Sequence, residues 1–215
     1  MILSPMLSEM NVFQNVLDNT TFHGRTLCQG KIGEQTVAVL NTGMGLVNTA
    51  LMLSHALDEL NPSAVISQGT AGAHVESLNV GDIVCATRFV YGDSVKGEQP
   101  LAVEVKNENR YSFDADPRFV EIGKRFGLAC GTVLSGYAWR TEKEDILCAH
   151  ARFESLCEEM EDAAAAQVCY ERGIPHGSFR IISNNHLRKD GAYCLSVAEK
   201  LQHFLITRIA NGELL

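Results

Sequence analysis

The sequence has no long apolar run, no excess of basic residues and no CxxC pair. No stretch is apolar enough to span a bilayer, and the opening "MILSPMLSEMNVF" lacks the charged and apolar regions of a signal peptide. We therefore expect a cytoplasmic protein with no membrane partner. Lys and Arg total 18 against 26 Asp and Glu, a formal net charge of −8. This balance argues against a nucleic-acid partner, because such proteins need basic patches to neutralise phosphate.

The chain also lacks a recognisable metal-ligand pattern. Its seven cysteines are an odd set that falls mostly within apolar segments, which indicates reduced core residues of a cytoplasmic protein. They are Cys28, Cys85, Cys130, Cys148, Cys157, Cys169 and Cys194. Five histidines do not have the spacing of metal ligands: His74, His150, His176, His186 and His203. We expect no metal and no cofactor.

The apolar pattern alternates between short β-rich runs and longer helical runs. With 46% hydrophobic and 20% charged residues, and no linker or repeat, the 215 residues suit one α/β domain over residues 1–215 with a buried central sheet. The expected strands are Thr36–Asn41, Ala64–Ser67, Asp82–Ala86, Leu101–Val105, Gly131–Ser135 and Ser178–Ser183. The expected helices are Glu9–Asp18, Leu46–Leu60, Arg118–Phe126, Glu142–Phe153, Glu161–Arg172 and Ala192–Ala210. The polar segment Gly92–Tyr111 is expected to leave the main sheet.

Two glycine-rich turns are expected directly after strands. The first is "NTGMG" over Asn41–Gly45, and the second is "QGTAG" over Gln68–Gly72. Glycine lets a backbone approach a ligand, and ligands of open α/β sheets collect at the carboxyl ends of strands. Neither turn has the GxGxxG spacing of a dinucleotide site, and no P-loop is present. Each turn is also compatible with a purely structural role.

Three segments carry polar groups suited to chemistry. Residues Cys157–Asp162 ("CEEMED") precede a small-residue helix whose tight packing would draw carboxylates inward, where they could accept the two hydroxyls of a ribose. The alternative is a solvated acidic helix cap. The cluster Ser183–His186 ends a β-rich run and could cap a helix or pair with a heterocycle. Glu9 could be a site residue or only a helix-dipole partner.

Taken together and in this order, these pieces resemble the 5′-methylthioadenosine/S-adenosylhomocysteine nucleosidases of the nucleoside phosphorylase superfamily. The resemblance rests on "SPMLSEM", "NTGMGLVNTA", "AVISQGTAGA", "LNVGDIV", "VLSGYAW", "EEMEDAAAAQVC", "GIP" and "RIISN" and covers nearly the whole chain. It implies a three-layer α/β/α sandwich around a mixed, distorted sheet. It also implies a homodimer that binds a small purine nucleoside.

The resemblance assigns residue roles by position. Glu9 and Asn184 match the catalytic pair, Glu9 activating water and Asn184 standing at purine N7 beside Ser183. Glu161 matches the glutamate that binds the ribose hydroxyls. The remaining matches on the substrate are Met6, Thr70, Gly72, Trp139, Arg140, Glu159 and Met160: Trp139 stacks on the purine, and the backbone at Arg140 contacts the base edge.

Two departures leave the reaction open. Asn184 replaces the usual aspartate and cannot hand a proton to N7, and Arg140 replaces a usually apolar residue. The segment "SQGTAGA" lacks the phosphate-holding arginine of the phosphorylase branch, which favours water as the nucleophile. The first hypothesis is hydrolysis of 5′-methylthioadenosine or S-adenosylhomocysteine, releasing adenine and the thioribose. The alternatives are hydrolysis of a 6-oxopurine nucleoside of the inosine or futalosine type, and a catalytically weak nucleoside-binding protein.

Overall fold

A central mixed sheet organises the chain. The computed structural model describes residues 1–93, 95–96, 99–189 and 191–214. The sheet has the order β11-β6-β12-β13-β5-β1-β4-β3-β2, and β14 pairs with both β5 and β6. Its strands are β1 (Ile2–Ser4), β2 (Asp18–Phe22), β3 (Arg25–Ile32), β4 (Gln35–Asn41), β5 (Val65–Ala73), β6 (Ile83–Tyr91), β11 (Phe113–Asp114), β12 (Ala129–Ser135), β13 (Ser155–Glu159) and β14 (His176–Asn184).

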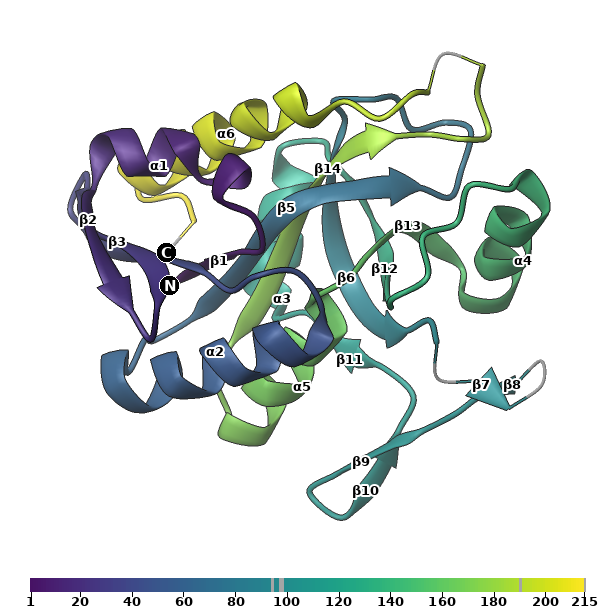
Figure 1. Ribbon diagram of the computed structural model, residues 1–215, viewed down its shortest axis with the longest axis horizontal. Helices are drawn as coiled ribbons and strands as arrows, with labels where there is room; N and C mark the ends of the chain where they lie inside the picture. The colour runs from purple at the N-terminus through teal and green to yellow at the C-terminus, as the bar shows by residue number, and fades with distance from the viewer. Residues whose placement is uncertain (94, 97–98, 190, 215) are drawn as a thin grey trace.

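Helices cover both faces of this sheet (Figure 1). They are α1 (Asn11–Val16), α2 (Leu46–Leu60), α3 (Pro117–Arg125), α4 (Lys143–Phe153), α5 (Asp162–Arg172) and α6 (Ala198–Ala210). Phe13 of α1, Phe119 of α3 and Leu205 of α6 share one buried cluster with the sheet. Leu53 of α2 and Cys169 of α5 share a second cluster with other strands. The three-layer α/β/α sandwich with a mixed sheet is therefore confirmed.

The strongest periodic segments were predicted with close bounds. Helix α2 has the expected bounds Leu46–Leu60, and α5 differs by one residue from the prediction. Strand β4 likewise begins one residue before its predicted start. The helix expected over Glu9–Asp18 is shortened at both ends to α1: a 3₁₀ turn spans Leu7–Glu9, and β2 begins at Asp18. The Asp18–Ile32 hairpin was not foreseen, since its first strand is polar and mostly exposed.

The second expected turn, Gln68–Gly72, is wrong. Strand β5 continues through it to Ala73, because β14 pairs along it to Gly72 and β13 pairs with its end. Ladder hydrogen bonds on both sides outweigh the weak strand preference of glycine. This carries the polar end of β5 deep into the sheet, next to the ends of β13 and β14.

The segment Gly92–Tyr111 leaves the main sheet as expected. It holds two small hairpins, β7 (Val95–Lys96) with β8 (Gln99–Pro100), and β9 (Val103–Val105) with β10 (Glu108–Arg110). The expected strand Leu101–Val105 is reduced to β9, and residues 94, 97 and 98 of this segment lie outside the described residues. Among the helices that the structure describes, none has the length and apolarity to cross a membrane.

Candidate active site

A pocket of about 120 Å³ opens where β1, β5, β13 and β14 end. Its walls come from segments far apart in the sequence, as the strand order requires. The structure brings most of the expected site residues to it: Met6, Glu9, Thr70, Gly72, Trp139, Glu159, Met160, Glu161, Ser183 and Asn184. Of the expected set, Arg140 alone is not among the residues lining the pocket.

Glu9 stands at one wall of the pocket with one oxygen fixed and one unpaired. The 3₁₀ turn buries it completely, and its Oε1 accepts a hydrogen bond from Thr70 N at 2.7 Å. Oε2 is buried without a hydrogen-bond partner among the described residues. Burial raises the pKa of Glu9, against the opposing effects of Thr70 and Arg180. A buried carboxylate of raised pKa with a spare oxygen is suited to take a proton from water.

Glu161 is held by the first glycine turn. Gly43 and Gly45 have φ values of 79° and 96°, which glycine adopts without strain. This turn aims Gly45 N at Glu161 Oε1, 2.8 Å away. Glu161 also precedes α5, so the turn, the helix start and the pocket meet at one carboxylate. The predicted turn over Asn41–Gly45 therefore positions a site residue directly.

Arg180 is a site-organising residue that the sequence analysis missed. Only 1% of its side chain is exposed, and its guanidinium contacts three carboxylates. Nε lies 3.0 Å from Asp162 Oδ2, Nη2 lies 2.8 Å from Glu159 Oε2, and Nη1 lies 3.4 Å from Glu161 Oε2. Burial alone would lower the pKa of Arg180, but these carboxylates outweigh it and raise the pKa. The one available signal was an arginine inside the otherwise apolar run "SFRIIS".

Glu159 is engaged by its neighbours although it lines the pocket. Its carboxylate accepts from the main-chain N of Glu161 at 2.7 Å and of Asp162 at 2.9 Å, and also from the hydroxyl of Ser135. Every one of these contacts, and the Arg180 contact, comes from a donor. The geometry therefore assigns Glu159 to fixing the turn that carries Glu161.

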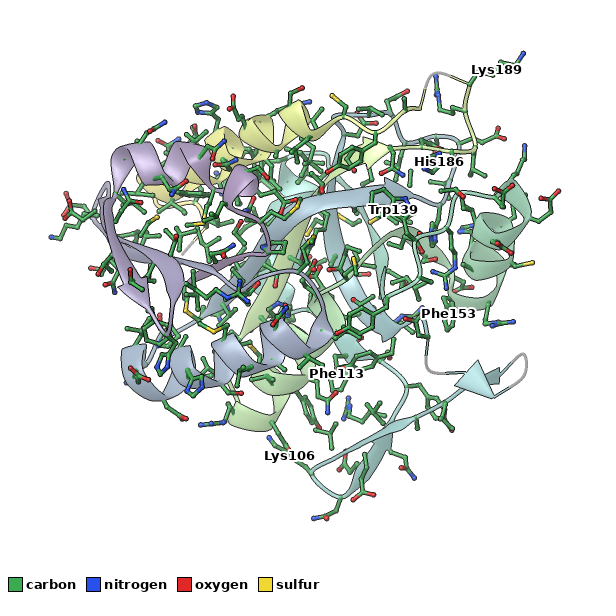
Figure 2. The ribbon with its side chains drawn as sticks, viewed as in Figure 1. Lys106, Phe113, Trp139, Phe153, His186 and Lys189 are labelled. Carbon is green, nitrogen blue, oxygen red and sulfur yellow. The ribbon has the colours of Figure 1, made fainter. Side chains whose placement is uncertain are left out.

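The opposite wall carries groups suited to a heterocycle. Ser183 Oγ lies 2.9 Å from Asn184 Oδ1, so the amide nitrogen Nδ2 is the atom turned toward Gly72. The ring of Trp139, which lies near the carboxyl end of β5 (Figure 2), has its centroid 5.8 Å from that of Tyr193. Both residues are exposed, Trp139 at 63% and Tyr193 at 45%. Tyr193 was not foreseen at the pocket, because it was expected in the helix Ala192–Ala210, whereas α6 begins only at Ala198.

Arg140 and Glu158 form an ion pair behind the pocket wall. Arg140 N donates to Glu158 Oε1 at 3.0 Å, and its guanidinium binds Glu158 Oε2. His74 Nε2 lies 3.2 Å from the same Oε2. The main-chain N of Arg140 is thus occupied by Glu158, and the contact between the Arg140 main chain and a base edge stays a prediction. The residue that lines the pocket here is Glu158.

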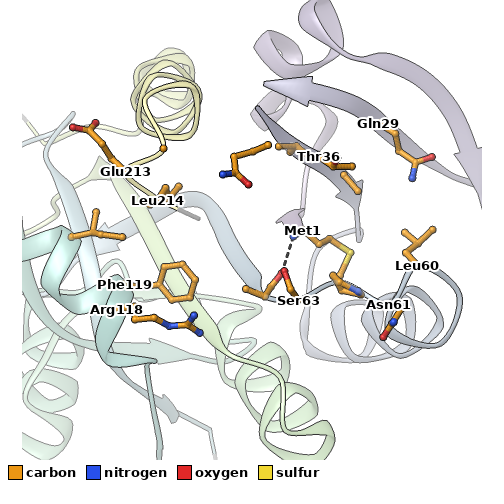
Figure 3. Close-up of a pocket in the computed structure, with 17 residues that line it drawn as sticks. Met1, Gln29, Thr36, Leu60, Asn61, Ser63, Arg118, Phe119, Glu213 and Leu214 are labelled. Carbon is orange, nitrogen blue, oxygen red and sulfur yellow. Dashed lines mark hydrogen bonds between the residues drawn. The ribbon is translucent and has the colours of Figure 1, made fainter. Parts of the chain in front are cut away.

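A larger hollow of about 590 Å³ lies elsewhere and contains none of the expected residues. Met1, Thr36, Asn61, Phe119 and Leu214 are among those that line it (Figure 3). Its charged lining groups are already paired, Arg118 with Asp116 and Glu213 with Arg125. The smaller pocket is the candidate active site, because it gathers carboxylates, an amide and aromatic rings at strand ends.

One group of potential metal ligands lies outside this pocket. His23 in the β2–β3 turn, with His55 and Glu59 of α2, has ligand atoms within 4.8 Å of one another. The two imidazoles stack with centroids 4.2 Å apart. None of the three lines the active-site pocket.

The chain is similar to known proteins over most of its length. The family model of the Phosphorylase superfamily matches residues 2–207. A 5′-methylthioadenosine/S-adenosylhomocysteine nucleosidase of Bacillus licheniformis is 29% identical over 195 residues, covering 85% of this chain and 84% of the relative. An S-adenosylhomocysteine nucleosidase of Streptococcus pyogenes, solved with 5-methylthiotubericidin, superposes with a TM-score of 0.86 at 24% identity, covering 98% and 95% of the two chains. The structure of the futalosine hydrolase of Helicobacter pylori superposes with a TM-score of 0.83 at 20% identity, covering 99% of this chain and 97% of that protein.

Proposed function

The chain belongs to the phosphorylase superfamily, and we propose that it is a purine nucleosidase that cleaves an N-glycosidic bond with water. The observation that carries this proposal is the pair Glu9 and Glu161 in one pocket. Glu9 offers a buried, unpaired oxygen, and Glu161 is fixed by Gly45 N. The names of the curated relatives point to 5′-methylthioadenosine and S-adenosylhomocysteine as the first substrates to test.

Ribosyl transfer to water passes through an oxocarbenium-like state, which places positive charge on the sugar. Glu161 accepts hydrogen bonds from the ribose hydroxyls, and its negative charge stabilises the positive charge on the sugar. Gly45 N and Arg180 hold the Glu161 carboxylate in place before the reaction. Glu9 orients the attacking water with Oε2 and takes its proton. Thr70 N holds the other oxygen of Glu9, so the carboxylate needs no rearrangement during the reaction.

The leaving purine gathers negative charge, which Asn184 stabilises by donating a hydrogen bond to N7. Ser183 orients the amide for this contact. Trp139 and Tyr193 supply the aromatic surface at the mouth of the pocket. Asn184 stabilises the departing base without protonating it, because an amide has no acidic proton to transfer.

Water rather than phosphate is the proposed nucleophile. The pocket lining among the described residues includes Glu9, Glu158, Glu159 and Glu161 and no lysine or arginine. Arg180 lies beneath Gly69 but is buried against three carboxylates, so it has no free edge for an anion. A phosphate dianion would meet these carboxylates with no basic side chain of the described pocket lining free to bind it.

A second candidate function is hydrolysis of a 6-oxopurine nucleoside, and the orientation of Asn184 favours it. With Oδ1 accepting from Ser183 Oγ, the amide atom next to Gly72 of the pocket wall is Nδ2, which carries two protons. Two donors match N7 and O6 of a 6-oxopurine, whereas N6 of adenine is itself a donor.

The variant Asn184→Asp tests the choice between the bases. An aspartate can carry a proton to N7 and accept from N6, so it should raise the activity on 5′-methylthioadenosine and lower that on inosine, relative to wild type. Base release is measured on both nucleosides for both proteins. A wild-type enzyme that cleaves inosine well and 5′-methylthioadenosine not at all would establish the second candidate. The reverse preference would exclude it.

We also propose a cytoplasmic homodimer. All seven cysteines are free thiols, as expected in a reducing compartment. Met44, Val47 and Leu51 are 57%, 70% and 54% exposed and follow one another along the start of α2. Met44 also lines the pocket, so a partner on this face would lie beside the substrate. Burial of these side chains between two copies of the chain would favour a dimer. The molar mass of the protein in solution measures whether the dimer forms.

A further inference from the structure

Three residues from three adjacent strands form a row across the floor of the pocket. Glu158 of β13 pairs in register with Gly72 of β5, and Gly72 pairs with Asn184 of β14. Neighbouring strands lie about 4.8 Å apart, which places Glu158 and Asn184 roughly 10 Å apart across Gly72. All three line the pocket. The row therefore has a hydrogen-bonding side chain at each end and open backbone in the middle.

Gly72 leaves room for a flat ring between the two ends. A Cβ added there would lie 3.0 Å from Asn184 Nδ2, so a larger residue would crowd the amide and fill the gap. A planar base with one hydrogen bond of about 2.9 Å on each side matches a span of this size. Asn184 then meets the N7 edge of the base, and Glu158 meets the neighbouring edge that carries N1.

Glu158 presents an acceptor to that edge. Its Oε2 is bound by the Arg140 guanidinium and lies near His74, whereas Oε1 has Arg140 N, at 3.0 Å, as its only donor among the described residues. A carboxylate oxygen has two lone pairs, so Oε1 can accept one more hydrogen bond. Burial alone would raise the pKa of Glu158, but His74 and Arg140 outweigh it and hold the pKa below its usual value. Glu158 is thus an ionised group that accepts and cannot donate.

We propose that Glu158 is a specificity-determining residue that reads the N1 edge of the base, next to the N7 edge that Asn184 meets, and selects a base carrying a ring N–H there. The inference rests on the proposed nucleosidase function and names its substrate class. A 6-oxopurine carries a proton on N1, whereas N1 of adenine is a bare acceptor that the carboxylate would repel. Asn184 Nδ2 donates to N7 and O6 of the same base, so both ends of the row select a 6-oxopurine.

The direct test uses the wild-type enzyme and three nucleosides with the same ribose: inosine, 1-methylinosine and adenosine. A site built around a substrate N–H rejects analogues that lack it, because a buried polar group is left unpaired. We expect kcat/KM for inosine to exceed that for each of the other two by about 100-fold or more. Equal turnover of inosine and 1-methylinosine, or a preference for adenosine, would overturn the assignment.

The variant Glu158→Gln tests the residue itself. A glutamine amide can accept from N1–H or donate to a bare N1, so the inosine-to-adenosine ratio of kcat/KM should fall by about 10-fold or more. The matched control is Glu142→Gln, an exposed glutamate at the start of α4, which should leave the ratio at its wild-type value. An unchanged ratio in a folded Glu158→Gln enzyme would contradict the proposal, and if that variant does not fold, the 1-methylinosine comparison decides.

Failure of the inference is distinguishable from failure of the function. If no nucleoside loses its base, the proposed nucleosidase activity is wrong. Calorimetric binding of hypoxanthine against 1-methylhypoxanthine to the wild-type protein then still tests Glu158. Tighter binding of hypoxanthine would support the assignment, and equal affinity would overturn it.

Discussion

At the scale of single residues, the pocket separates two glutamates by how each is held. Glu9 is buried with one unpaired oxygen, and Glu161 has its oxygens directed by Gly45 N and Arg180. The first arrangement suits proton transfer and the second suits a fixed negative charge. Glutamine has nearly the same shape as glutamate, so replacing either residue by glutamine changes the chemistry of the side chain more than its packing.

Glu9→Gln and Glu161→Gln should each abolish most activity with the fold retained. Loss of a general base costs about 10²–10⁴-fold in rate. Glu161→Gln should also weaken nucleoside binding, because a charged acceptor bonds hydroxyls more strongly than an amide does. Steady-state kinetics and a thermal melt measure both effects, with Glu142→Gln as the exposed control. Near-normal kcat/KM in either variant would show that the residue is wrongly assigned.

At the scale of elements, the sequence predicts what local periodicity determines. Helix α2 was predicted with its bounds because apolar residues recur at helical spacing between Gly45 and Asn61, which adopts a left-handed conformation. Strand β13 was not predicted, because "SLCEE" reads as an acidic cap when considered alone. Arg180 of β14, about twenty residues further along the chain, pairs with Glu159 of this strand inside the fold. Such tertiary pairing has no local signal.

The candidate site follows the same division. The positions of Glu9, Glu161 and Asn184 came from a resemblance in motifs, and the structure gathers them in one pocket. Glu158 was not predicted as a site residue, because the resemblance assigned roles only to its neighbours Glu159 and Glu161 in the acidic segment. Only the register of β13 against β5 shows that Glu158 faces Gly72 and the pocket.

The first glycine turn can be tested as an element. Gly45 has φ of 96°, and a Cβ there would lie 2.8 Å from the Tyr137 ring. Gly45→Ala should therefore lower stability by about 1–3 kcal/mol and raise KM, since Gly45 N would no longer hold Glu161. Gly127→Ala is the control: φ is 66°, but nothing lies within 4 Å of the added Cβ. It should lose stability only, and an equal KM effect in both variants would contradict this role of the turn.

At the scale of the whole molecule, the buried imidazole of His176 couples stability to pH. Nε2 lies 2.9 Å from Ser67 Oγ, and Nδ1 is buried without a partner among the described residues. Burial lowers the pKa of His176 to about 4 from a usual 6.5. The unfolded chain therefore binds a proton between pH 6.5 and 4 that the folded chain does not, and stability falls as the pH drops through this window. The loss should total about 3 kcal/mol by pH 4.

Urea unfolding at pH 7, 5.5 and 4 measures this loss, and one domain predicts a single transition at each pH. His176→Gln should flatten the pH dependence, whereas the exposed control His203→Gln should not change it. Wild type and His176→Gln losing stability in parallel would mean that other groups set the acid sensitivity.

The central claim is that this chain breaks a purine N-glycosidic bond with water, using Glu9 and Glu161 in a pocket without a basic lining residue among those described. The most direct measurement is product analysis after incubation with 5′-methylthioadenosine and inosine, each with and without phosphate. The account predicts free base and free ribose derivative at a rate that phosphate does not change. Ribose 1-phosphate formed in a phosphate-dependent reaction, or nucleoside binding with no base released, would contradict it.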